Sequence, residues 1–315
     1  MKNSRMKIIS GTGHRALAER IASAAGVELC DVDSTRFPDG EIFVKIVDNV
    51  RGDDLFIVQS VSIEPNNYLM ELLIMIDAAK RASADRITAV LPYYGYARQD
   101  RKDQPRVPIT AKLVAKLLES AGADRVLCVD LHAQQIQGFF DVPVDHLYGS
   151  PVIVKYLRTL DLDDLVVVSP DAGGLKMADA YSKLLDAGIA LVGKQRKSAE
   201  DVEANHLVGD VEGRNTLLVD DMTSTAGTLT AAAKLLEKAG AKSIRAAVSH
   251  SLLTQKGIDR LKDSAIVELV TTDTVPQREW TDFNVTVLSV ADTLAEAICR
   301  IHNDQSVSSL FRVDN

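Results

Sequence analysis

Short apolar runs alternate along the chain with longer stretches in which apolar residues recur every three or four positions. The runs are rich in Val, Ile and Leu, a pattern typical of strands buried on both faces. The longer stretches are typical of helices that cover such strands. The alternation therefore predicts an α/β fold with mostly parallel sheets flanked by helices. The expected strands are residues 55–59, 87–91, 126–130, 165–169, 189–193 and 216–221.

Two of the expected helices stop at a glycine. Residues 108–122 and 228–240 each carry a helical apolar pattern that closes at Gly122 or Gly240. Glycine accepts the positive φ angle that ends many helices, so we expect both helices to end there.

Residues 33–47 follow a different pattern. The turn residues Pro38, Asp39 and Gly40 precede a segment in which apolar and polar residues alternate. This arrangement predicts a hairpin or projecting flap, an element suited to contacts between subunits.

The chain length of 315 residues favours two domains. Residues 50–60 resemble residues 211–221, and residues 84–92 resemble residues 241–250, at nearly equal offsets. Two copies of one α/β unit would explain these similarities. The alternative is that any two βαβ units look alike at this level. We expect an N-terminal domain at 1–149 and a C-terminal domain at 150–315, with a C-terminal segment that can pack on the N-terminal domain.

Composition excludes several classes of protein. With 46% hydrophobic and 25% charged residues the chain is of ordinary globular type, and its net charge of −8 disfavours a protein that coats nucleic acid. The three cysteines have no metal-binding or redox spacing, which favours a reducing, cytoplasmic location. No apolar run suits export or membrane insertion.

The sequence LLVDDMTSTAGT at residues 217–228 carries the strongest chemical signal. A buried strand delivers the carboxylates of Asp220 and Asp221 at its C-terminal end, and a turn of small and hydroxyl residues leads into a helix. Backbone N–H groups in such a turn converge on an anion, and the helix N-terminus favours negative charge. The carboxylates can accept hydrogen bonds from sugar hydroxyls. The motif indicates a ribose-phosphate site, with an ordinary helix N-cap as the alternative.

Two other glycine motifs look like nucleotide-binding loops. Residues 188–195 have P-loop spacing, but Gln195 stands where Ser or Thr is needed, and the intervening residues form a strand. Residues 11–16 follow a strand and precede a helix, as in a dinucleotide-binding loop. The chain then enters the flap instead of a second crossover helix, which disfavours that interpretation.

The 217–228 motif is similar to the ribose-phosphate loop of type I phosphoribosyltransferases, and the whole chain resembles the ribose-phosphate pyrophosphokinase, or phosphoribosyl pyrophosphate synthase, family. The resemblance implies two similar domains of phosphoribosyltransferase-like fold. The stretches that carry it are residues 37–41, 71–83, 92–102, 108–112, 129–147, 166–174, 194–196 and 305–311.

The resemblance implies transfer of the pyrophosphoryl group of ATP to the C1 hydroxyl of ribose 5-phosphate, with AMP released. The implied catalytic cations are Lys194 and Arg196, on a stretch suited to a flap. The implied pyrophosphate loop is Asp171, Ala172, Gly173 and Gly174. The residues implied to bind ribose 5-phosphate are Arg196, Asp220, Asp221, Ser224, Thr225, Ala226, Gly227 and Thr228.

On the ATP side, the resemblance implies binding by Arg98 and Gln99, and by a flap that reaches in from a neighbouring subunit of a homo-oligomer, a hexamer in the family. An aromatic ring on that flap can stack on the adenine, and its carboxylates can accept hydrogen bonds. The flap residues are Phe37, Asp39 and Glu41. The implied cofactor is Mg²⁺, with His132 and Asp171 as ligands.

The C-terminal QSVSSLF and the segment around Lys80 are implied to form a regulatory site, where phosphate activates and ADP inhibits. The alternative is that Leu310 and the residue after it dock the chain terminus. The regulatory residues are Arg81, Ser83, Ser306, Ser308 and Phe311.

Three features depart from the family pattern. Met177 and Asp179 stand where arginines are common, Ser224 stands where Asp is usual, and the flap lacks the family's prolines. We therefore retain, beside an active synthase, the alternative of a catalytically weak regulatory paralogue. A downstream phosphoribosyltransferase is disfavoured, because it would not need the ATP-side motifs.

Overall fold

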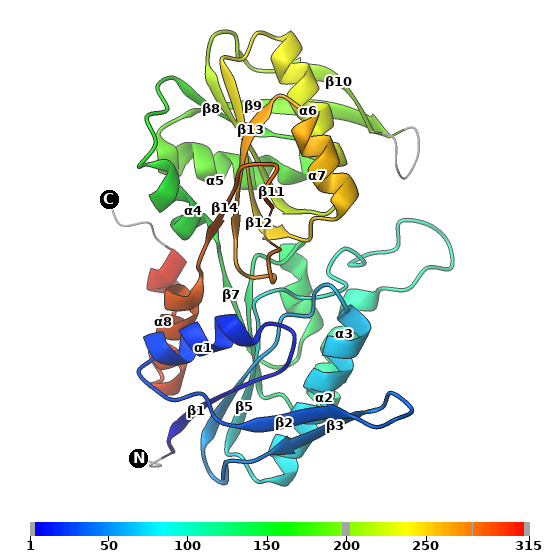
Figure 1. The fold of residues 1–315 in the computed structure, drawn as a ribbon, viewed down its shortest axis with the longest axis vertical. Helices are drawn as coiled ribbons and strands as arrows, with labels where there is room; N and C mark the ends of the chain where they lie inside the picture. The colour runs from blue at the N-terminus through cyan, green and yellow to red at the C-terminus, as the bar shows by residue number, and fades with distance from the viewer. Residues whose placement is uncertain (1–3, 197–201, 279, 312–315) are drawn as a thin grey trace. The chain divides into compact units, whose positions relative to one another are not determined.

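The computed structural model describes residues 4–196, 202–278 and 280–311, and the side chains of residues 194–205 and 311 lie outside the described part. The chain divides into two compact units (Figure 1). The first unit contains Met1–Tyr148, Thr274–Pro276 and Val290–Arg312, and the second contains Gly149–Asp273, Gln277–Ser289 and Val313–Asn315.

The first unit is built on a five-stranded parallel sheet in the order β1-β4-β5-β6-β7. The α/β prediction is confirmed, and three expected strands coincide with β4, β5 and β6 to within one residue. The strands are β1 (Met6–Ser10), β4 (Asp54–Val58), β5 (Arg86–Leu91), β6 (Arg125–Val129) and β7 (Val144–Leu147).

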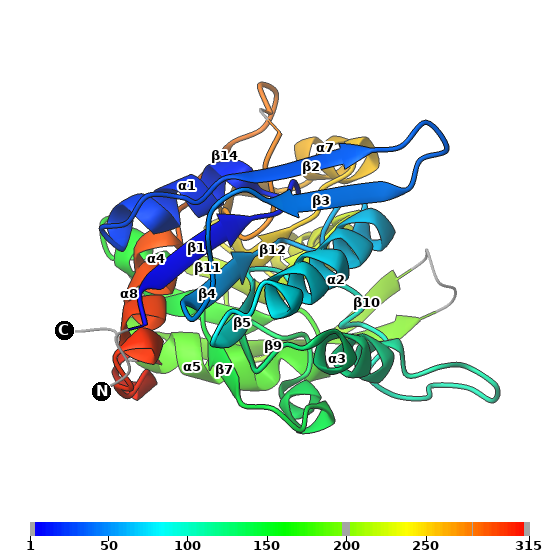
Figure 2. The same ribbon diagram turned by 90° about the horizontal axis from the view of Figure 1, so that it is seen from below.

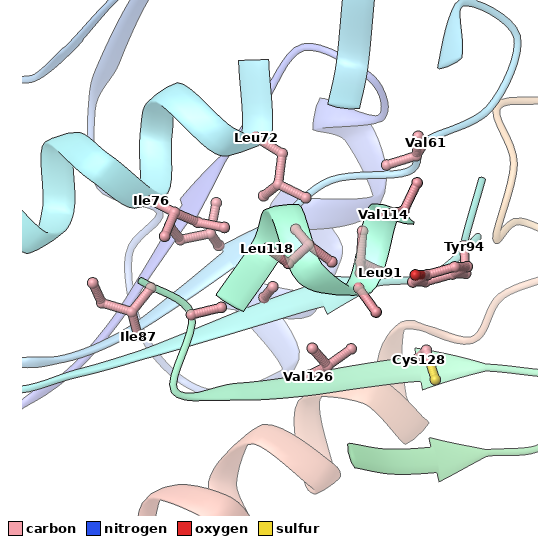
Figure 3. Close-up of a cluster of buried hydrophobic side chains, with 14 of the residues drawn as sticks. Val61, Leu72, Ile76, Ile87, Leu91, Tyr94, Val114, Leu118, Val126 and Cys128 are labelled. Carbon is pink, nitrogen blue, oxygen red and sulfur yellow. The ribbon is translucent and has the colours of Figure 1, made fainter. Parts of the chain in front are cut away.

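Helices cover both faces of this sheet. Figures 1 and 2 show α1 (Arg15–Ala24) and α8 (Ala291–His302) side by side on the face opposite α2 (Pro65–Arg81) and α3 (Thr110–Ala121). The apolar stripes of α2 and α3 pack on the strands in a continuous core, which buries alternate positions of β4 and β5. Figure 3 labels Val61, Leu72, Ile76, Ile87, Leu91, Tyr94, Val114, Leu118, Val126 and Cys128 in this core.

The segment expected to form a hairpin is the antiparallel pair β2 (Val32–Arg36) and β3 (Ile42–Ile46). Its strands form a separate two-stranded sheet, and β3 packs on α2 (Figure 2). The turn between them contains Gly40 at φ +94°. The hairpin prediction is therefore confirmed.

The second unit is a seven-stranded sheet in the order β10-β9-β8-β11-β12-β13-β14. All neighbours are parallel except β10 and β9. The strands are β8 (Leu165–Ser169), β9 (Gly188–Arg196), β10 (Val202–Val208), β11 (Asn215–Thr223), β12 (Ser243–Ser251), β13 (Ile266–Thr272) and β14 (Val285–Leu288).

Two apolar clusters hold the helices of this unit on its sheet. One cluster packs α6 (Gly227–Lys238) and α7 (Gln255–Lys262) against the sheet, and the other packs α4 (Ser150–Leu157) and α5 (Leu175–Leu185). Because both faces are covered, the central strands are apolar on both sides, as their sequences indicate. Among the described helices, none combines the length and the apolar character needed to cross a membrane.

Three short 3₁₀ helices complete the described elements: η1 (Gln134–Phe139), η2 (Ala172–Gly174) and η3 (Ser308–Phe311). Gly122 ends α3 at φ +119° as expected, and Gly240 lies at φ +81° two residues after α6 ends. The helix predicted over 108–122 begins only at Thr110.

Candidate active site

The carboxyl ends of β8 and β11 lie side by side in the second unit, because these strands are parallel neighbours. Residues 171–174 follow β8, and residues 220–228 close β11 and enter α6. Open α/β sheets bind ligands at the carboxyl ends of their strands. The fold thus brings the segments expected to form the pyrophosphate loop and the ribose-phosphate loop to one edge of one sheet.

The loop after β8 has a fixed backbone. Asp171 caps η2, and its Oδ1 atom accepts hydrogen bonds from the N–H groups of Gly173 at 2.9 Å and Gly174 at 3.2 Å. Ser169 donates to the Asp171 carbonyl at 2.6 Å, and a Cβ on Gly174 would lie 2.9 Å from Ser169 Oγ. A side chain at Gly174 would therefore displace the serine that holds the loop.

Two adjacent carboxylates stand near the end of β11. Asp221 is 9% exposed, and its N–H donates to Asp220 Oδ1 at 3.0 Å. Burial is the first cause that raises the pKa of Asp220 well above its ordinary value, and the charges of Asp221 and Asp171 add to it. A positive charge or sugar hydroxyls beside this pair would favour its ionised form.

The loop between β11 and α6 is shaped to receive an anion. Ala226 lies at φ +52°, in the left-handed region that few non-glycine residues adopt. Within the described chain, the N–H groups of residues 225–228 donate to no other protein group. They stand at the positive end of α6, so the loop can bind a phosphate monoester.

Lys194 and Arg196, the expected catalytic cations, are placed near the end of β9. The backbone pairs them with β10, with Ala204 opposite Lys194 and Val202 opposite Arg196. Their side chains lie outside the described residues, so the catalytic assignment stays a prediction.

Helix α5 accounts for two of the departures from the family pattern. Met177 packs against the apolar cluster beneath α4 and α5, and Asp179 pairs with Lys183 one turn further on at 2.7 Å. Both side chains therefore serve the helix itself, one by packing and one by a surface ion pair.

In the first unit, the turn of the β2–β3 hairpin carries the residues expected at the adenine. Phe37 is 50% exposed and meets Phe43 edge to face at a ring separation of 5.7 Å. Its N–H donates to the Glu41 carbonyl at 2.9 Å, and the Glu41 N–H donates to Asp39 Oδ1 at 3.2 Å. The turn thus presents an aromatic face and two exposed carboxylates on an ordered backbone.

Arg98 and Gln99 lie on the loop between β5 and α3. Thr110 donates to Gln99 Oε1 at 2.5 Å, and the Gln99 carbonyl accepts from the Ala111 N–H at 3.1 Å. The Arg98 side chain is exposed and forms no ion pair with any described residue. No hydrogen bond or ion pair within the described chain joins these residues to the hairpin turn.

His132 lies on the exposed turn that follows β6. The residue before it, Leu131, donates its N–H to Nε2 of the buried His146 at 2.9 Å. This hydrogen bond holds the backbone that carries His132.

The residues expected at a regulatory site form two separate groups. Arg81 pairs with Asp77 at 2.7 Å at the end of α2, and Ser83 follows at φ +64°. The Ser306 hydroxyl accepts from the Ser308 N–H at 3.2 Å near the C-terminus. Within the described chain no hydrogen bond joins the two groups, and the Phe311 side chain lies outside the described residues.

The loop at residues 11–16 is occupied by the protein's own side chains. Glu71, which is 2% exposed, accepts from Thr12 N at 3.0 Å and from Thr12 Oγ1 at 2.8 Å. Gly13 N donates to Gln59 Oε1 at 2.9 Å, and a Cβ on Gly13 would lie 2.6 Å from the Ser60 carbonyl. These amides are used internally, which agrees with the sequence argument against a dinucleotide loop.

Sequence reasoning missed the segment that supports the ribose-phosphate loop. Residues 252–260 contact the loop through Thr254, Gly257 and Arg260. Its clearest sequence signal is Thr254, which caps α7 by accepting from the Gly257 N–H. That signal marks a helix start and carries no hint of a binding role.

Fold and site together define an α/β protein with two glycine-containing loops and paired carboxylates at the ends of neighbouring parallel strands. The N-terminal domain model of ribose phosphate pyrophosphokinase matches residues 6–122. The model of the phosphoribosyl synthetase-associated domain matches residues 204–312.

Relatives match over almost the whole chain. A ribose-phosphate pyrophosphokinase from Rhodopirellula baltica is 51% identical over 311 residues, and the match covers 98% of each chain. Ribose-phosphate pyrophosphokinase 1 from Spinacia oleracea is 50% identical over 314 residues, and the match covers 98% of this chain and 94% of the spinach protein. The phosphoribosylpyrophosphate synthetase structure from Mycobacterium smegmatis has a TM-score of 0.89 at 41% identity, covering 96% of this chain and 100% of its own. The chain belongs to the ribose-phosphate pyrophosphokinase family.

Proposed function

We propose that this enzyme transfers the β,γ-pyrophosphoryl group of ATP to the C1 hydroxyl of ribose 5-phosphate, giving 5-phosphoribosyl 1-pyrophosphate and AMP. The family supports this reaction. The structural observation that carries it is the pairing of an acidic dyad with two anion loops at adjacent strand ends. The alternative of a weakly active regulatory paralogue gains no support from these relatives.

Ribose 5-phosphate binds at the end of β11 in this proposal. Its phosphate accepts hydrogen bonds from the N–H groups of residues 225–228 and from the hydroxyls of Ser224, Thr225 and Thr228. The ribose hydroxyls donate to Asp220 and Asp221, and Arg196 adds a positive charge. Fixed donors of this kind bind a dianion without reorganising, which favours binding of the substrate in one orientation.

The pyrophosphoryl group lies at residues 171–174, next to the ribose site along the same sheet edge. The glycines give close backbone approach, and Asp171 fixes the loop by accepting from the N–H groups of Gly173 and Gly174. On the ATP side, Arg98 and Gln99 bind the nucleotide, and Phe37 stacks on the adenine of a neighbouring subunit's ATP.

Of the two proposed ligands, the carboxylate of Asp171 suits magnesium better. Mg²⁺ prefers oxygen ligands and is usually held by one or two carboxylates, waters and substrate phosphates. The described residues contain no cluster of three or more His, Cys, Asp or Glu side chains that could hold a metal by themselves. Asp171, with His132, would hold the ion, which when bound neutralises charge on the phosphates.

Lys194 and Arg196 are the proposed catalytic residues. The C1 hydroxyl oxygen attacks the β-phosphorus and releases its proton to solvent, the bond from that phosphorus to the α-phosphate oxygen breaks, and AMP leaves in line. Negative charge spreads over the transferred group during this displacement, so cations held close to it lower the barrier.

Several finer assignments complete the proposal. The predicted domains 1–149 and 150–315 correspond to the two compact units to within one residue at their boundary, except that residues 274–276 and 290–312 belong to the first unit. The active form is a homo-oligomer, a hexamer as in the family pattern. Phosphate activates and ADP inhibits through Arg81, Ser83, Ser306, Ser308 and Phe311. The protein works in the cytoplasm and needs neither nucleic acid nor membrane.

The proposal is tested by mixing the purified protein with ATP, Mg²⁺ and ribose 5-phosphate and measuring AMP. AMP should form only when ribose 5-phosphate is present, and Asp221→Asn should reduce the rate at least tenfold through loss of a buried acceptor. Formation of ADP instead of AMP, or AMP release without the sugar, would overturn it.

A further inference from the structure

The ribose-phosphate loop is held from one side by residues 252–260, here called the support segment, which runs from the end of β12 into α7. Three successive carbonyls accept hydrogen bonds from it. The Thr223 carbonyl accepts from Leu252 N at 2.8 Å, and the Ser224 carbonyl accepts from Thr254 N at 3.0 Å. The Thr225 carbonyl accepts from Arg260 Nη1 at 3.2 Å.

These three bonds determine where the loop directs its donors. In a planar trans peptide the C=O and the following N–H point in opposite directions. Fixing the Ser224 and Thr225 carbonyls toward the support segment turns the N–H groups of Thr225 and Ala226 away from it. These N–H groups are among the proposed phosphate donors. A carbonyl that accepts from a guanidinium is also polarised, which strengthens the N–H of the same peptide as a donor.

The contact between loop and support segment is as close as backbone allows. A Cβ on Gly257 would lie 2.5 Å from the Ser224 carbonyl oxygen, and a Cβ on Gly227 would lie 2.9 Å from Arg260 Nη1. Ala226 at φ +52° sits between these two contacts. A non-glycine residue keeps such a conformation only where its surroundings impose it.

Arg260 also brings charge to the loop. Its side chain is half-buried, and within the described chain it forms no ion pair. Its one hydrogen bond to the described chain is the bond to the Thr225 carbonyl. A guanidinium keeps its proton at any physiological pH, so the loop always has this positive charge behind it.

We propose that Arg260 is a positioning residue for ribose 5-phosphate: it aims the Ala226 N–H at the substrate phosphate and adds a fixed positive charge behind the loop. This inference rests on the proposed function of the loop. It predicts a specific defect in sugar-phosphate binding, separate from any effect on ATP.

The test compares Arg260→Met and Arg260→Lys with Lys262→Met, a control that removes one positive charge from the same helix. Lys262 pairs with Asp282 at 2.6 Å on the surface, away from the proposed loop contacts. Arg260→Met should raise the KM for ribose 5-phosphate roughly 10- to 100-fold, the change expected for one lost charged hydrogen bond, with the KM for ATP within about twofold. Arg260→Lys should be intermediate, and the control should match the parent protein.

A second readout does not depend on turnover. Ribose 5-phosphate should raise the thermal unfolding midpoint of the parent and of Lys262→Met, and raise that of Arg260→Met much less. Gly257→Ala, whose Cβ meets the Ser224 carbonyl, should show the same loss. Equal rises in all variants, or equal increases in both KM values, would overturn the positioning role. A parent protein that binds ribose 5-phosphate yet forms no AMP would refute the proposed reaction and leave the binding comparison valid.

Discussion

At the scale of single residues, the acidic pair at the end of β11 places two carboxylates where a folded protein usually avoids unpaired charge. The pKa of Asp220 lies well above its ordinary value, first because burial disfavours the charged form and then because of the neighbouring charge of Asp221. Such an arrangement costs stability and persists where a ligand uses it. The sequence identified both acids, because adjacent carboxylates at the end of an apolar run are unusual.

The raised pKa of Asp220 predicts a pH-dependent stability difference. Above its folded-state pKa the Asp220 carboxylate is charged in the folded and in the unfolded protein, but the charge is disfavoured in the folded protein. The free energy of unfolding therefore falls as the pH rises from 3.8, the pKa in the unfolded chain, through the higher pKa in the folded protein. Asp220→Asn should therefore be more stable than the parent at pH 8 in magnesium-free buffer, and the difference should vanish below about pH 4. Urea unfolding at several pH values measures it. Asp179→Asn, at an exposed ion pair, is the control, and a less stable Asp220→Asn at pH 8 would contradict the prediction.

The catalytic cations give a second prediction at this scale. Lys194→Ala and Arg196→Ala should each lower kcat by about 100-fold or more, because their charges act mainly as the pyrophosphoryl group moves. Steady-state kinetics with both substrates measure this effect, together with ribose 5-phosphate binding by calorimetry. Preserved kcat with weakened binding would assign both residues to substrate binding only.

At the scale of elements, sequence periodicity predicted strands such as β4, β8 and β11, and it missed β12, whose carboxyl end is polar. The last residues of β12, Ser249 to Ser251, are polar and nearly fully buried, so their sequence looks like a loop. Helix α7 is short and polar and contains Gly257, which weakens its helical pattern. The support segment was missed for this reason: its role depends on backbone contacts with residues about 30 positions earlier, and these leave no local pattern.

Helix α8 shows a long-range anchor that no local pattern could reveal. Asp54, buried at 2% exposure, accepts from Arg86 Nε at 2.8 Å and contacts His302 Nδ1 at 2.8 Å. Arg86 also donates to the Ile301 carbonyl at 2.9 Å. The end of α8 is thereby tied to β4 and β5 of the first unit.

Removing the arginine from this anchor should loosen α8. Arg86→Met should lower the free energy of unfolding by about 2–4 kcal/mol, because it leaves a buried carboxylate with fewer partners. Lys183→Met breaks an exposed ion pair between residues one helical turn apart, and it should lower the free energy of unfolding by less than about 0.5 kcal/mol. Chemical denaturation measures the free energy of unfolding of both variants. Equal decreases in the two variants would show that the buried network stabilises the protein no more than the exposed ion pair does.

At the scale of the whole molecule, the family, the α/β fold and the reaction were all predictable from ordered motifs, and full-length relatives confirm the family. The homo-oligomer is predicted by the family resemblance alone and stays a prediction, because a hairpin with exposed aromatic and acidic residues has the same sequence whether or not a neighbour uses it. The roles of individual site residues stay predictions of the resemblance.

Shared active sites predict complementation between inactive variants. If Phe37, Asp39 and Glu41 complete a neighbour's ATP site, Phe37→Ala and Lys194→Ala proteins should each be nearly inactive alone and recover activity when mixed and allowed to exchange subunits. Hybrid assemblies contain some sites with both native residues, so recovery of a few tenths of the parent rate is expected. Mixing Lys194→Ala with Arg196→Ala is the control. A fully active monomer on a sizing column would contradict the prediction.

The central claim is that both distal phosphates of ATP leave together and arrive on C1 of the sugar. Phosphorus NMR of the protein with ATP, Mg²⁺ and ribose 5-phosphate follows this transfer directly. The account predicts that the β and γ signals of ATP disappear at one rate while AMP and a ribose-bound pyrophosphate accumulate in equal amounts. Loss of the γ signal alone with ADP as product, or pyrophosphate appearing free in solution with the sugar unchanged, would contradict it.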